Sequence, residues 1–283
     1  MLLTYRQLSF STIIIYYSVM GNKELIGFAV IAVIAVLACT FIVDSHHDGD
    51  DTERIGIIGA MDDEIAALRD AMDIEYTETL FDMTFNVGTL KGKDIALVKC
   101  GMGKVNAGIC AEIMITHFNA KSIINTGVSG SMDNDLDILD FVVSTDAVQH
   151  DFDVSPIGFE KGEIPYTGKY SFEADPELAT KAALAVSQFI MGSKVMQGRI
   201  CTGDQFINSD EQKDTILSNF GGLCCDMESG AIAQVCYLSD VPFVIIRAIS
   251  DKADHSASMD YDEFEPIAAE RSASAVMYML GIL

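Results

Sequence analysis

The sequence predicts an α/β fold for residues 54–283, with a central β-sheet and helices packed against it. From Arg54 onward, short apolar runs alternate with longer segments in which apolar residues recur every three or four positions. The run VPFVIIRAISD, residues 241–251, is opened by Pro242 and closed by polar residues, which is typical of a buried parallel strand. A chain of 283 residues that is 49% apolar can bury a core of the size this fold needs.

The first half of the domain is expected to begin with a strand, because RIGIIGAM is a short apolar run, and to continue with a helix. TFNVGTL and DIALVKC flank the turn-forming Lys91-Gly92-Lys93 and predict a hairpin. A helical pattern and a buried strand that ends in glycines follow. The ranges in order are a strand at 54–61, a helix at 62–72, a hairpin at 84–100, a helix at 103–118 and a strand at 121–130.

The second half continues the alternation, and an Asn-Ser-Asp cap region begins one of its helices. The predicted elements are a strand at 139–148, a helix at 173–189, a strand at 196–203, a helix at 209–220, a helix from 230, a strand at 241–251 and a helix from 260. No internal repeat or second linker interrupts them. We therefore expect residues 54–283 to form one domain.

Residues 1–53 differ from the rest and predict a membrane segment. Leu25–Val43 contains 19 residues without a charge, close to the ~20 that span a bilayer as a helix. Arg6 and Lys23 precede this stretch, and four aspartates follow it within residues 44–51. The positive-inside rule then places the amino terminus in the cytoplasm and the domain outside. A cytoplasmic domain is the alternative if the segment is not used.

The sequence leaves the use of this segment open. A start at Met20 would give the basic and apolar regions of a secretory signal. Val36-Leu37-Ala38-Cys39 resembles a bacterial lipoprotein cleavage site with Cys39 as the lipidated residue, although Leu37 is bulkier than usual there. An uncleaved anchor is the other interpretation. SHHDGDDTE, residues 45–53, is expected to be a polar linker.

The charge and the cysteine pattern argue against a nucleic-acid partner and against a metal site. The formal net charge of -24 argues against a nucleic-acid partner, because binding to a phosphate backbone depends on Lys and Arg. The seven cysteines show neither a CxxC pair nor the spacing of metal ligands. We expect buried thiols, and neither a metal nor a cofactor.

Polar residues follow four of the predicted strands, at Met61–Glu64, Asn125–Gly130, Asp226–Glu228 and Arg247–Asp251. If these strands are parallel neighbours, the polar residues meet in one cleft. Regular alternation along 241–251 would also place Arg247 and Asp251 on one side. Carboxylates in a partly dry cleft raise one another's pKa, so that one can stay protonated near neutral pH. This arrangement suits general acid/base chemistry on an uncharged substrate.

Six strings in this order closely resemble the 5′-methylthioadenosine/S-adenosylhomocysteine nucleosidases: IGIIGAMDDEI, GMGKVNAG, INTGVSG, GDQFIN, DMES and RAISDKAD. Each string is weak alone, and six in register are specific. The resemblance covers residues 54–283 and none of the first 53. It implies the nucleoside phosphorylase fold, a three-layer arrangement in which a central twisted mixed sheet is flanked by helices.

The resemblance also implies the roles of individual residues. Asp251 matches the general acid that protonates N7 of the departing adenine, and Glu64 matches the base that activates water. Asp62 and Asp63 are expected only to balance the helix dipole. Glu228 matches the carboxylate that accepts hydrogen bonds from the ribose hydroxyls. The other expected substrate-binding residues are Val128, Ser129, Gly130, Phe206 (stacking on adenine), Ile207 (reading the purine edge), Met227 (against the sugar), Arg247 (keeping Glu64 ionised) and Ser250 (orienting Asp251).

Some positions depart from the family pattern. Val128 and Ser129 stand where many members have Ser-Ala or Val-Ala, so a hydroxyl that positions the water is either moved to 129 or absent. Ser131 stands where a second Gly is common, and Asp226 replaces a frequent Glu. Neither the acid nor the base is affected.

Other functions fit the same fold. A nucleoside phosphorylase would need phosphate beneath the sugar, which Met61-Asp62-Asp63-Glu64 would repel. A futalosine hydrolase would differ in what the 5′ pocket accepts, and the sequence leaves that substituent open. An exported lipoprotein that binds nucleosides without turnover is the alternative outside enzymes. The family further implies a homodimer, in which the acidic stretch 150–169 is expected to close the partner's 5′ pocket.

Overall fold

The structure is a computed structural model that describes residues 52–283. The predicted membrane segment at 25–43, Cys39 and most of the polar linker lie outside the described residues, and the predictions for them stay predictions. None of the helices within residues 52–283 has the length and apolar character that a bilayer crossing requires.

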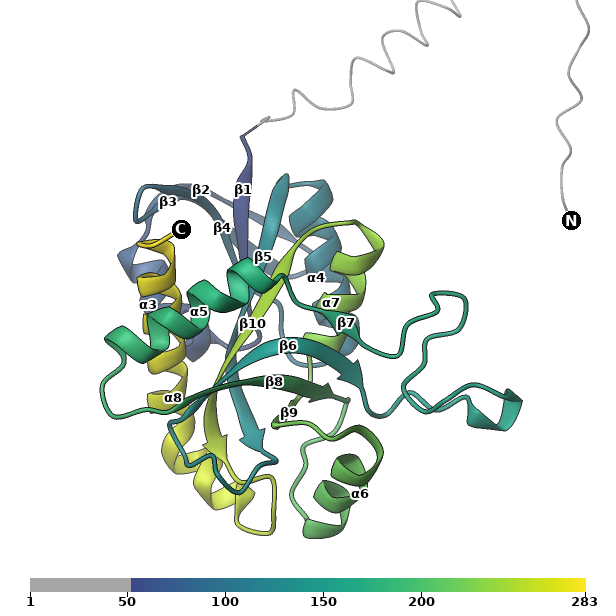
Figure 1. The fold of residues 1–283 in the computed structure, drawn as a ribbon. Helices are drawn as coiled ribbons and strands as arrows, with labels where there is room; N and C mark the ends of the chain where they lie inside the picture. The colour runs from purple at the N-terminus through teal and green to yellow at the C-terminus, as the bar shows by residue number, and fades with distance from the viewer. Residues whose placement is uncertain (1–51) are drawn as a thin grey trace, which may run out of the picture. The chain divides into compact units, whose positions relative to one another are not determined.

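A mixed β-sheet forms the centre of the domain (Figure 1). Its parallel part consists of β4 (Lys93–Lys99), β1 (Arg54–Gly59), β5 (Ala120–Ser131) and β10 (Phe243–Asp251), paired in that order. On the outer side, β3 (Met83–Leu90) pairs antiparallel with β4, and β2 (Asp73–Leu80) pairs antiparallel with β3. The strands of the parallel part are almost wholly buried, because helices cover both of their faces.

The rest of the sheet closes on itself. β10 pairs antiparallel with β6 (Phe141–Gln149), and β6 pairs parallel with β8 (Val195–Thr202). β8 pairs with the short β9 (Cys224–Asp226), which returns to β5 in antiparallel register. The pairings β5–β10–β6–β8–β9–β5 therefore form a ring. The two-residue β7 (Phe172–Glu173) adds to the edge of β6.

Helices cover both faces of the sheet, which confirms the predicted α/β architecture. α3 (Asp62–Ala71), α5 (Pro176–Phe189) and α8 (Ala257–Leu280) lie on one face, and α4 (Lys104–Thr116) and α7 (Ser229–Leu238) lie on the other (Figure 1). Each face has its own core of buried aliphatic side chains. α6 (Asp210–Phe220) packs beside β9, and the segment from 150 to 171, which includes the 3₁₀ turn Ser155–Ile157, projects away from the body (Figure 1).

Four details of the prediction are wrong. β2 was not predicted, because its side chains are mostly exposed and show no apolar alternation. α5 begins at Pro176 instead of Glu173, since the Asp175 side chain accepts hydrogen bonds from the N–H groups of Glu177 and Leu178 and caps the helix. α8 begins at Ala257 instead of Asp260. β9 runs antiparallel to β5, so the four polar strand ends are not all parallel neighbours.

Candidate active site

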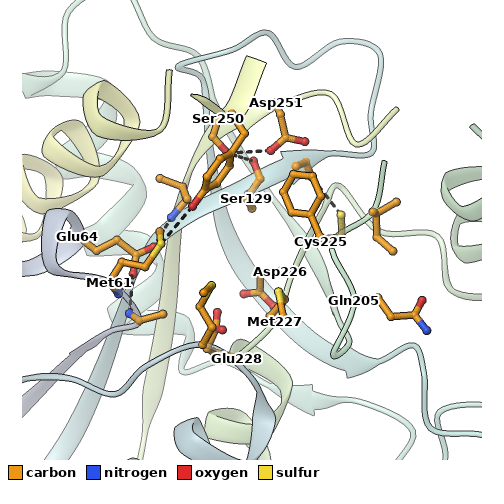
Figure 2. Close-up of a pocket in the computed structure, with 17 residues that line it drawn as sticks. Met61, Glu64, Ser129, Gln205, Cys225, Asp226, Met227, Glu228, Ser250 and Asp251 are labelled. Carbon is orange, nitrogen blue, oxygen red and sulfur yellow. Dashed lines mark hydrogen bonds between the residues drawn. The ribbon is translucent and has the colours of Figure 1, made fainter. Parts of the chain in front are cut away.

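One pocket collects residues from all four of the predicted polar segments (Figure 2). Its empty volume, which includes space open to solvent, is about 560 Å³. The lining residues are Ala60, Met61, Glu64, Met102, Val128, Ser129, Gly130, Gln205, Phe206, Ile207, Cys225, Asp226, Met227, Glu228, Ser250, Asp251 and Tyr261. Every predicted site residue except Arg247 is among them.

Glu64 is held in the pocket by three backbone N–H groups. It is the third residue of α3, and its Oε2 accepts hydrogen bonds from Ala60 N (2.5 Å) and Met61 N (3.0 Å). The bond from Met61 N is one half of a capping box, so the residue also stabilises the start of the helix. Oε1 accepts a hydrogen bond from Val128 N on β5, at 2.9 Å. Burial raises the pKa of the Glu64 carboxyl, while the Arg247 charge and these three hydrogen bonds act to lower it.

Asp251 stands at the end of β10 in a different setting. Its Oδ1 accepts a hydrogen bond from Ala253 N (2.8 Å), and its Oδ2 lies 2.9 Å from Ser250 Oγ (Figure 2). Ser250 Oγ also lies 3.3 Å from the carbonyl oxygen of Ser129. When the serine hydroxyl turns to that carbonyl, Oδ2 is free to carry a proton. Burial raises the pKa of the Asp251 carboxyl, and the backbone and serine hydrogen bonds act to lower it.

Arg247 is buried and is not one of the residues that line the pocket, and its place among the substrate-binding residues stays a prediction. Its Nε donates to Asp226 Oδ2 at 2.8 Å, and its NH2 group donates to Asn125 Oδ1 and Ser229 Oγ at 2.9 and 3.0 Å. The same group lies 3.8 Å from Glu228 Oε2. The side chain is 1% exposed. Its charge therefore compensates the two carboxylates of the β9–α7 segment by direct ion pairing.

The different positions of Arg247 and Asp251 follow from a break in strand regularity. β10 pairs with β5 residue by residue from Phe243 to Ile249, after which the register shifts, so that Ile249 faces Ser129 and Asp251 faces Gly130. An extra residue of this kind redirects the side chains that follow it. The expected alternation of Arg247 and Asp251 on one side therefore does not hold to the end of the strand.

Gly127 leaves the space that brings Arg247 near Glu64. A Cβ atom built on Gly127 would stand 2.2 Å from Arg247 NH1 and 2.2 Å from Glu64 Oε1. A side chain at this position would thus collide with both charged groups. Because Gly127 has no side chain, the Arg247 guanidinium can lower the pKa of the Glu64 carboxyl through space. This direction agrees with the expected role of Arg247, which is to keep Glu64 ionised.

Glu228 is the third buried carboxyl group of the site. Its Oε1 accepts a hydrogen bond from Gly103 N at 2.8 Å, immediately before α4. Burial and the neighbouring Asp226 charge raise the pKa of Glu228 to about 7, although Arg247 acts to lower it. Asp226 is fixed by Arg247, by Thr202 Oγ1 at 2.5 Å and by a short hydrogen bond from Ser229. Both oxygens of Asp226 are thus occupied within the protein.

The remaining predicted residues complete the walls. Ser129 Oγ is buried without a hydrogen-bond partner among the described residues, so a hydroxyl is present at 129 and absent at Val128. Phe206 is 42% exposed, and its ring meets that of Tyr261 edge to face at 5.5 Å. Sequence reasoning missed five lining residues: Ala60, Met102, Gln205, Cys225 and Tyr261. All of them except Tyr261 lie within or beside the strings that resemble the family, and this position along the chain was the available signal.

One group of possible metal ligands lies outside this pocket. In the part of the chain that the structure describes, Asp210, Asp254 and His255 bring their ligand atoms within 4.8 Å of one another, but none of them lines the pocket. The six described cysteines are buried and free. The pocket thus offers carboxyl groups, a hydroxyl and backbone amides for chemistry on a bound substrate.

Glu265 on α8 predicts a pH dependence of stability. The residue is 8% exposed, and its Oε1 has no hydrogen-bond partner within residues 52–283. Burial, with the negative charges of Asp63 and Glu64, raises its pKa from 4.5 to about 7. A carboxyl whose pKa is raised on folding stabilises the folded state fully below its unfolded pKa, and this stabilisation is lost as the pH rises through the folded pKa.

We therefore expect Glu265→Gln to raise the melting temperature at pH 8 by about 2–4 °C, as about 1 kcal/mol does for a domain of this size, and to leave it unchanged near pH 4.5. The measurement is the melting temperature of variant and wild type across this pH range. Glu270→Gln, at an exposed position of the same helix, is the control and should show no such trend. A difference that does not depend on pH would contradict the assignment.

Comparison with known proteins gives consistent matches over the described domain. The family model of the phosphorylase superfamily matches residues 54–280. A 5′-methylthioadenosine/S-adenosylhomocysteine nucleosidase from Shewanella pealeana is 39% identical over 229 residues, which are 80% of this chain and 98% of the relative. The protein of the same name from Staphylococcus carnosus is 40% identical over 230 residues, 81% of this chain and 100% of the relative.

Solved structures resemble the domain equally closely. The nucleosidase from Neisseria meningitidis in complex with methylthio-immucillin-A has a TM-score of 0.79 and 36% identity, and the match covers 82% of this chain and 100% of that chain. The futalosine hydrolase of Helicobacter pylori has a TM-score of 0.77 and 31% identity, with 82% and 98% covered.

Proposed function

The chain belongs to the phosphorylase superfamily and, within it, to the 5′-methylthioadenosine/S-adenosylhomocysteine nucleosidases, and from this premise we propose that Glu64 and Asp251 are its catalytic base and acid. It is a hydrolase that cleaves the N-glycosidic bond of these nucleosides and releases adenine. One observation carries the residue assignment: a single pocket holds two buried carboxyl groups, one fixed by three N–H donors and one beside a hydroxyl.

Asp251 supplies the proton for the leaving group. Adenine leaves poorly as an anion, so protonation at N7 must accompany the departure of the electron pair of the C1′–N9 bond to the purine. The pKa of Asp251 is raised by burial, which favours the protonated form that a general acid requires. Ser250 positions the carboxyl, because its hydroxyl can turn to the Ser129 carbonyl while Oδ2 holds the proton.

Glu64 activates the water. As the bond to adenine lengthens, positive charge develops on the sugar, and the water oxygen bonds to the anomeric carbon while one of its protons passes to the carboxylate. The three N–H donors and the Arg247 charge oppose the effect of burial and favour the ionised form that can accept this proton. Arg247 thus acts as a positioning residue, since it does not line the pocket.

The other predicted residues bind the substrate. Glu228 accepts hydrogen bonds from the two ribose hydroxyls, and Met227 packs against the sugar. Phe206 stacks on adenine, and the backbone of Ile207 bonds to the purine edge. Val128, Ser129 and Gly130 line the side of the pocket that β5 provides, and the buried Ser129 hydroxyl has no hydrogen-bond partner within residues 52–283.

Two enzymes of the same fold are the competing functions. A phosphorylase needs cationic side chains or free amides around a phosphate. None of the described residues that line the pocket is Lys or Arg, and four of them carry carboxyl groups. A futalosine hydrolase is favoured by one observation, the TM-score of 0.77 with the Helicobacter pylori enzyme. The substrate's 5′ substituent separates that function from the one proposed.

A single assay tests the proposed function. The purified full chain is incubated with 5′-methylthioadenosine in phosphate-free buffer, and we expect free adenine and 5-methylthioribose in equal amounts. A requirement for phosphate, with a sugar 1-phosphate as product, would identify a phosphorylase. Turnover of futalosine alone would identify the other hydrolase. Binding of 5′-methylthioadenosine without release of adenine would support the non-catalytic binding protein and reject the enzyme.

We further propose a homodimer. Apolar side chains are exposed on and just before α4 and at the end of α7. Met102, Val105 and Leu238 are 60%, 73% and 63% exposed, and Met102 also lines the pocket. A second copy on this surface would bury them and complete the pocket mouth, and the projecting segment 150–169 is the proposed closing loop. Sedimentation equilibrium measures the oligomeric state, and a fully active monomer would contradict the proposed homodimer.

The membrane association and the extracytoplasmic placement of the domain are likewise proposals, based on the uncharged stretch 25–43 and the charges around it. Protease accessibility in intact cells separates the two orientations. Protection of the domain from added protease would reject an outward-facing domain.

A further inference from the structure

One part of the pocket has no role in cleaving the glycosidic bond. If adenine lies between Phe206 and Asp251 and the ribose lies between Glu64 and Glu228, the lining residues that are left without a role include Met61, Met102 and Tyr261. This inference rests on the proposed function, because it takes that substrate orientation as given. The remaining wall then faces the 5′ substituent of the nucleoside.

This wall is not purely apolar. The Tyr261 hydroxyl on α8 donates a hydrogen bond to the thioether sulfur of Met61, at 3.1 Å between Oη and Sδ. Burial and the neighbouring Glu265 raise the pKa of Tyr261 further above its usual value, so the phenol stays protonated and remains a donor at any working pH. The edge-to-face contact with Phe206 limits where the Tyr261 ring can move.

The acceptor of this hydrogen bond has the same chemistry as the proposed substrate. Sulfur in a thioether is a weak acceptor, and Tyr261 is already oriented toward one. Met61 has an unbranched, flexible side chain that can withdraw when a ligand enters. A 5′-thioether can then take its place, whereas a 5′-alkyl group would leave the partly buried hydroxyl without a partner, which is costly.

We propose that Tyr261 is a specificity-determining residue, whose hydroxyl donates a hydrogen bond to the 5′ heteroatom of the substrate and so favours 5′-thio nucleosides over their 5′-alkyl counterparts. Met61 accepts the hydrogen bond from Tyr261 before the ligand binds, and the 5′ heteroatom of the ligand then replaces it as the acceptor. The residue takes no part in breaking the glycosidic bond.

The test uses two substrates of nearly equal shape, 5′-methylthioadenosine and 5′-deoxy-5′-ethyladenosine, in which a methylene replaces the sulfur. The kcat/KM ratio of the two is measured for the wild-type chain and for Tyr261→Phe. A neutral hydrogen bond contributes about 1 kcal/mol, which corresponds to about fivefold. We expect the ratio to fall by about fivefold in the variant.

A purely structural role of the hydroxyl has a different signature. If it only held Met61 in place, Tyr261→Phe would reduce kcat/KM for both substrates equally, and an unchanged ratio would overturn the proposal. Met61→Leu provides a second variant. It removes the internal acceptor, which either substrate must displace, but leaves the Tyr261 hydroxyl in place, so the ratio of the two substrates should stay near its wild-type value. A fall in the ratio as large as that in Tyr261→Phe would count against the proposal.

The experiment distinguishes failure of the proposed nucleosidase function from failure of the proposed role of Tyr261. Release of adenine from neither substrate by the wild-type chain would reject the nucleosidase activity itself. Release from both, with the same ratio in wild type and Tyr261→Phe, would reject only the role of Tyr261.

Discussion

Replacing Asp251 with asparagine is expected to lower kcat for adenine release by about 10²–10⁴-fold, the range for a general acid or base. The amide can still accept the hydrogen bond that Asp251 Oδ1 receives from Ala253 N, so we expect the fold and substrate binding to be kept. It carries no proton that it can give to N7. The measurements are kcat with 5′-methylthioadenosine, the melting temperature and the substrate dissociation constant.

A neighbouring residue provides the matched control. Asp254 lies three positions later and uses its carboxylate to bond to Ser256, and it does not line the pocket. Asp254→Asn should retain wild-type kcat. A 5-methylthioriboside with a p-nitrophenolate leaving group needs no protonation, and Asp251→Asn should cleave it at nearly the wild-type rate. An equal loss on both substrates would show that Asp251 is not the acid.

Replacing Glu64 with glutamine should reduce kcat by a similar factor of about 10²–10⁴, because the amide cannot take a proton from water. A second effect follows from the three N–H donors around the carboxylate. In the variant, the side-chain NH₂ group must face either the N–H group of Val128 or those of Ala60 and Met61. In either orientation two hydrogen-bond donors face each other without an acceptor. We therefore expect a lower melting temperature together with the loss of kcat.

Two further variants separate these effects. Asp63→Asn removes a carboxylate from the same helical turn at an exposed position and should leave kcat unchanged. Glu64→Asp keeps the charge but withdraws it by one methylene, so catalysis should fall while the repulsion between donors is avoided. Substrate binding, measured by calorimetry, should persist in all three variants. Wild-type kcat in Glu64→Gln would mean that another group activates the water.

Sequence reasoning was most successful where burial leaves a clear pattern. β1, β5 and β10 are short apolar runs buried on both faces, and the residues at their ends meet in the pocket as expected. β2 carries mostly exposed side chains and therefore shows no periodic signal. β9 has only three residues, and its antiparallel pairing with β5 depends on the closure of the sheet, which no local pattern encodes.

The site was predictable in its residues but not in all of their partners. The recognised strings contain Glu64, Glu228 and Asp251, and the structure brings these three together. The ion pair of Arg247 with Asp226 joins β10 to β9, two strands that are not paired with each other, so no local sequence pattern indicates it. Tyr261 reaches the pocket only because α8 packs back over the sheet, so spacing along the chain could not indicate it.

The ring of strands β5–β10–β6–β8–β9 restricts how the protein can open. Each strand of the ring has a hydrogen-bonded neighbour on either side, so none can separate from the sheet without breaking two ladders. Local opening is therefore expected to be confined to segments outside the ring. Entry of substrate and exit of adenine then depend on segments outside the ring and on side chains at the rim, such as the exposed Met102 and Phe206, while the backbone that carries the acid stays closed.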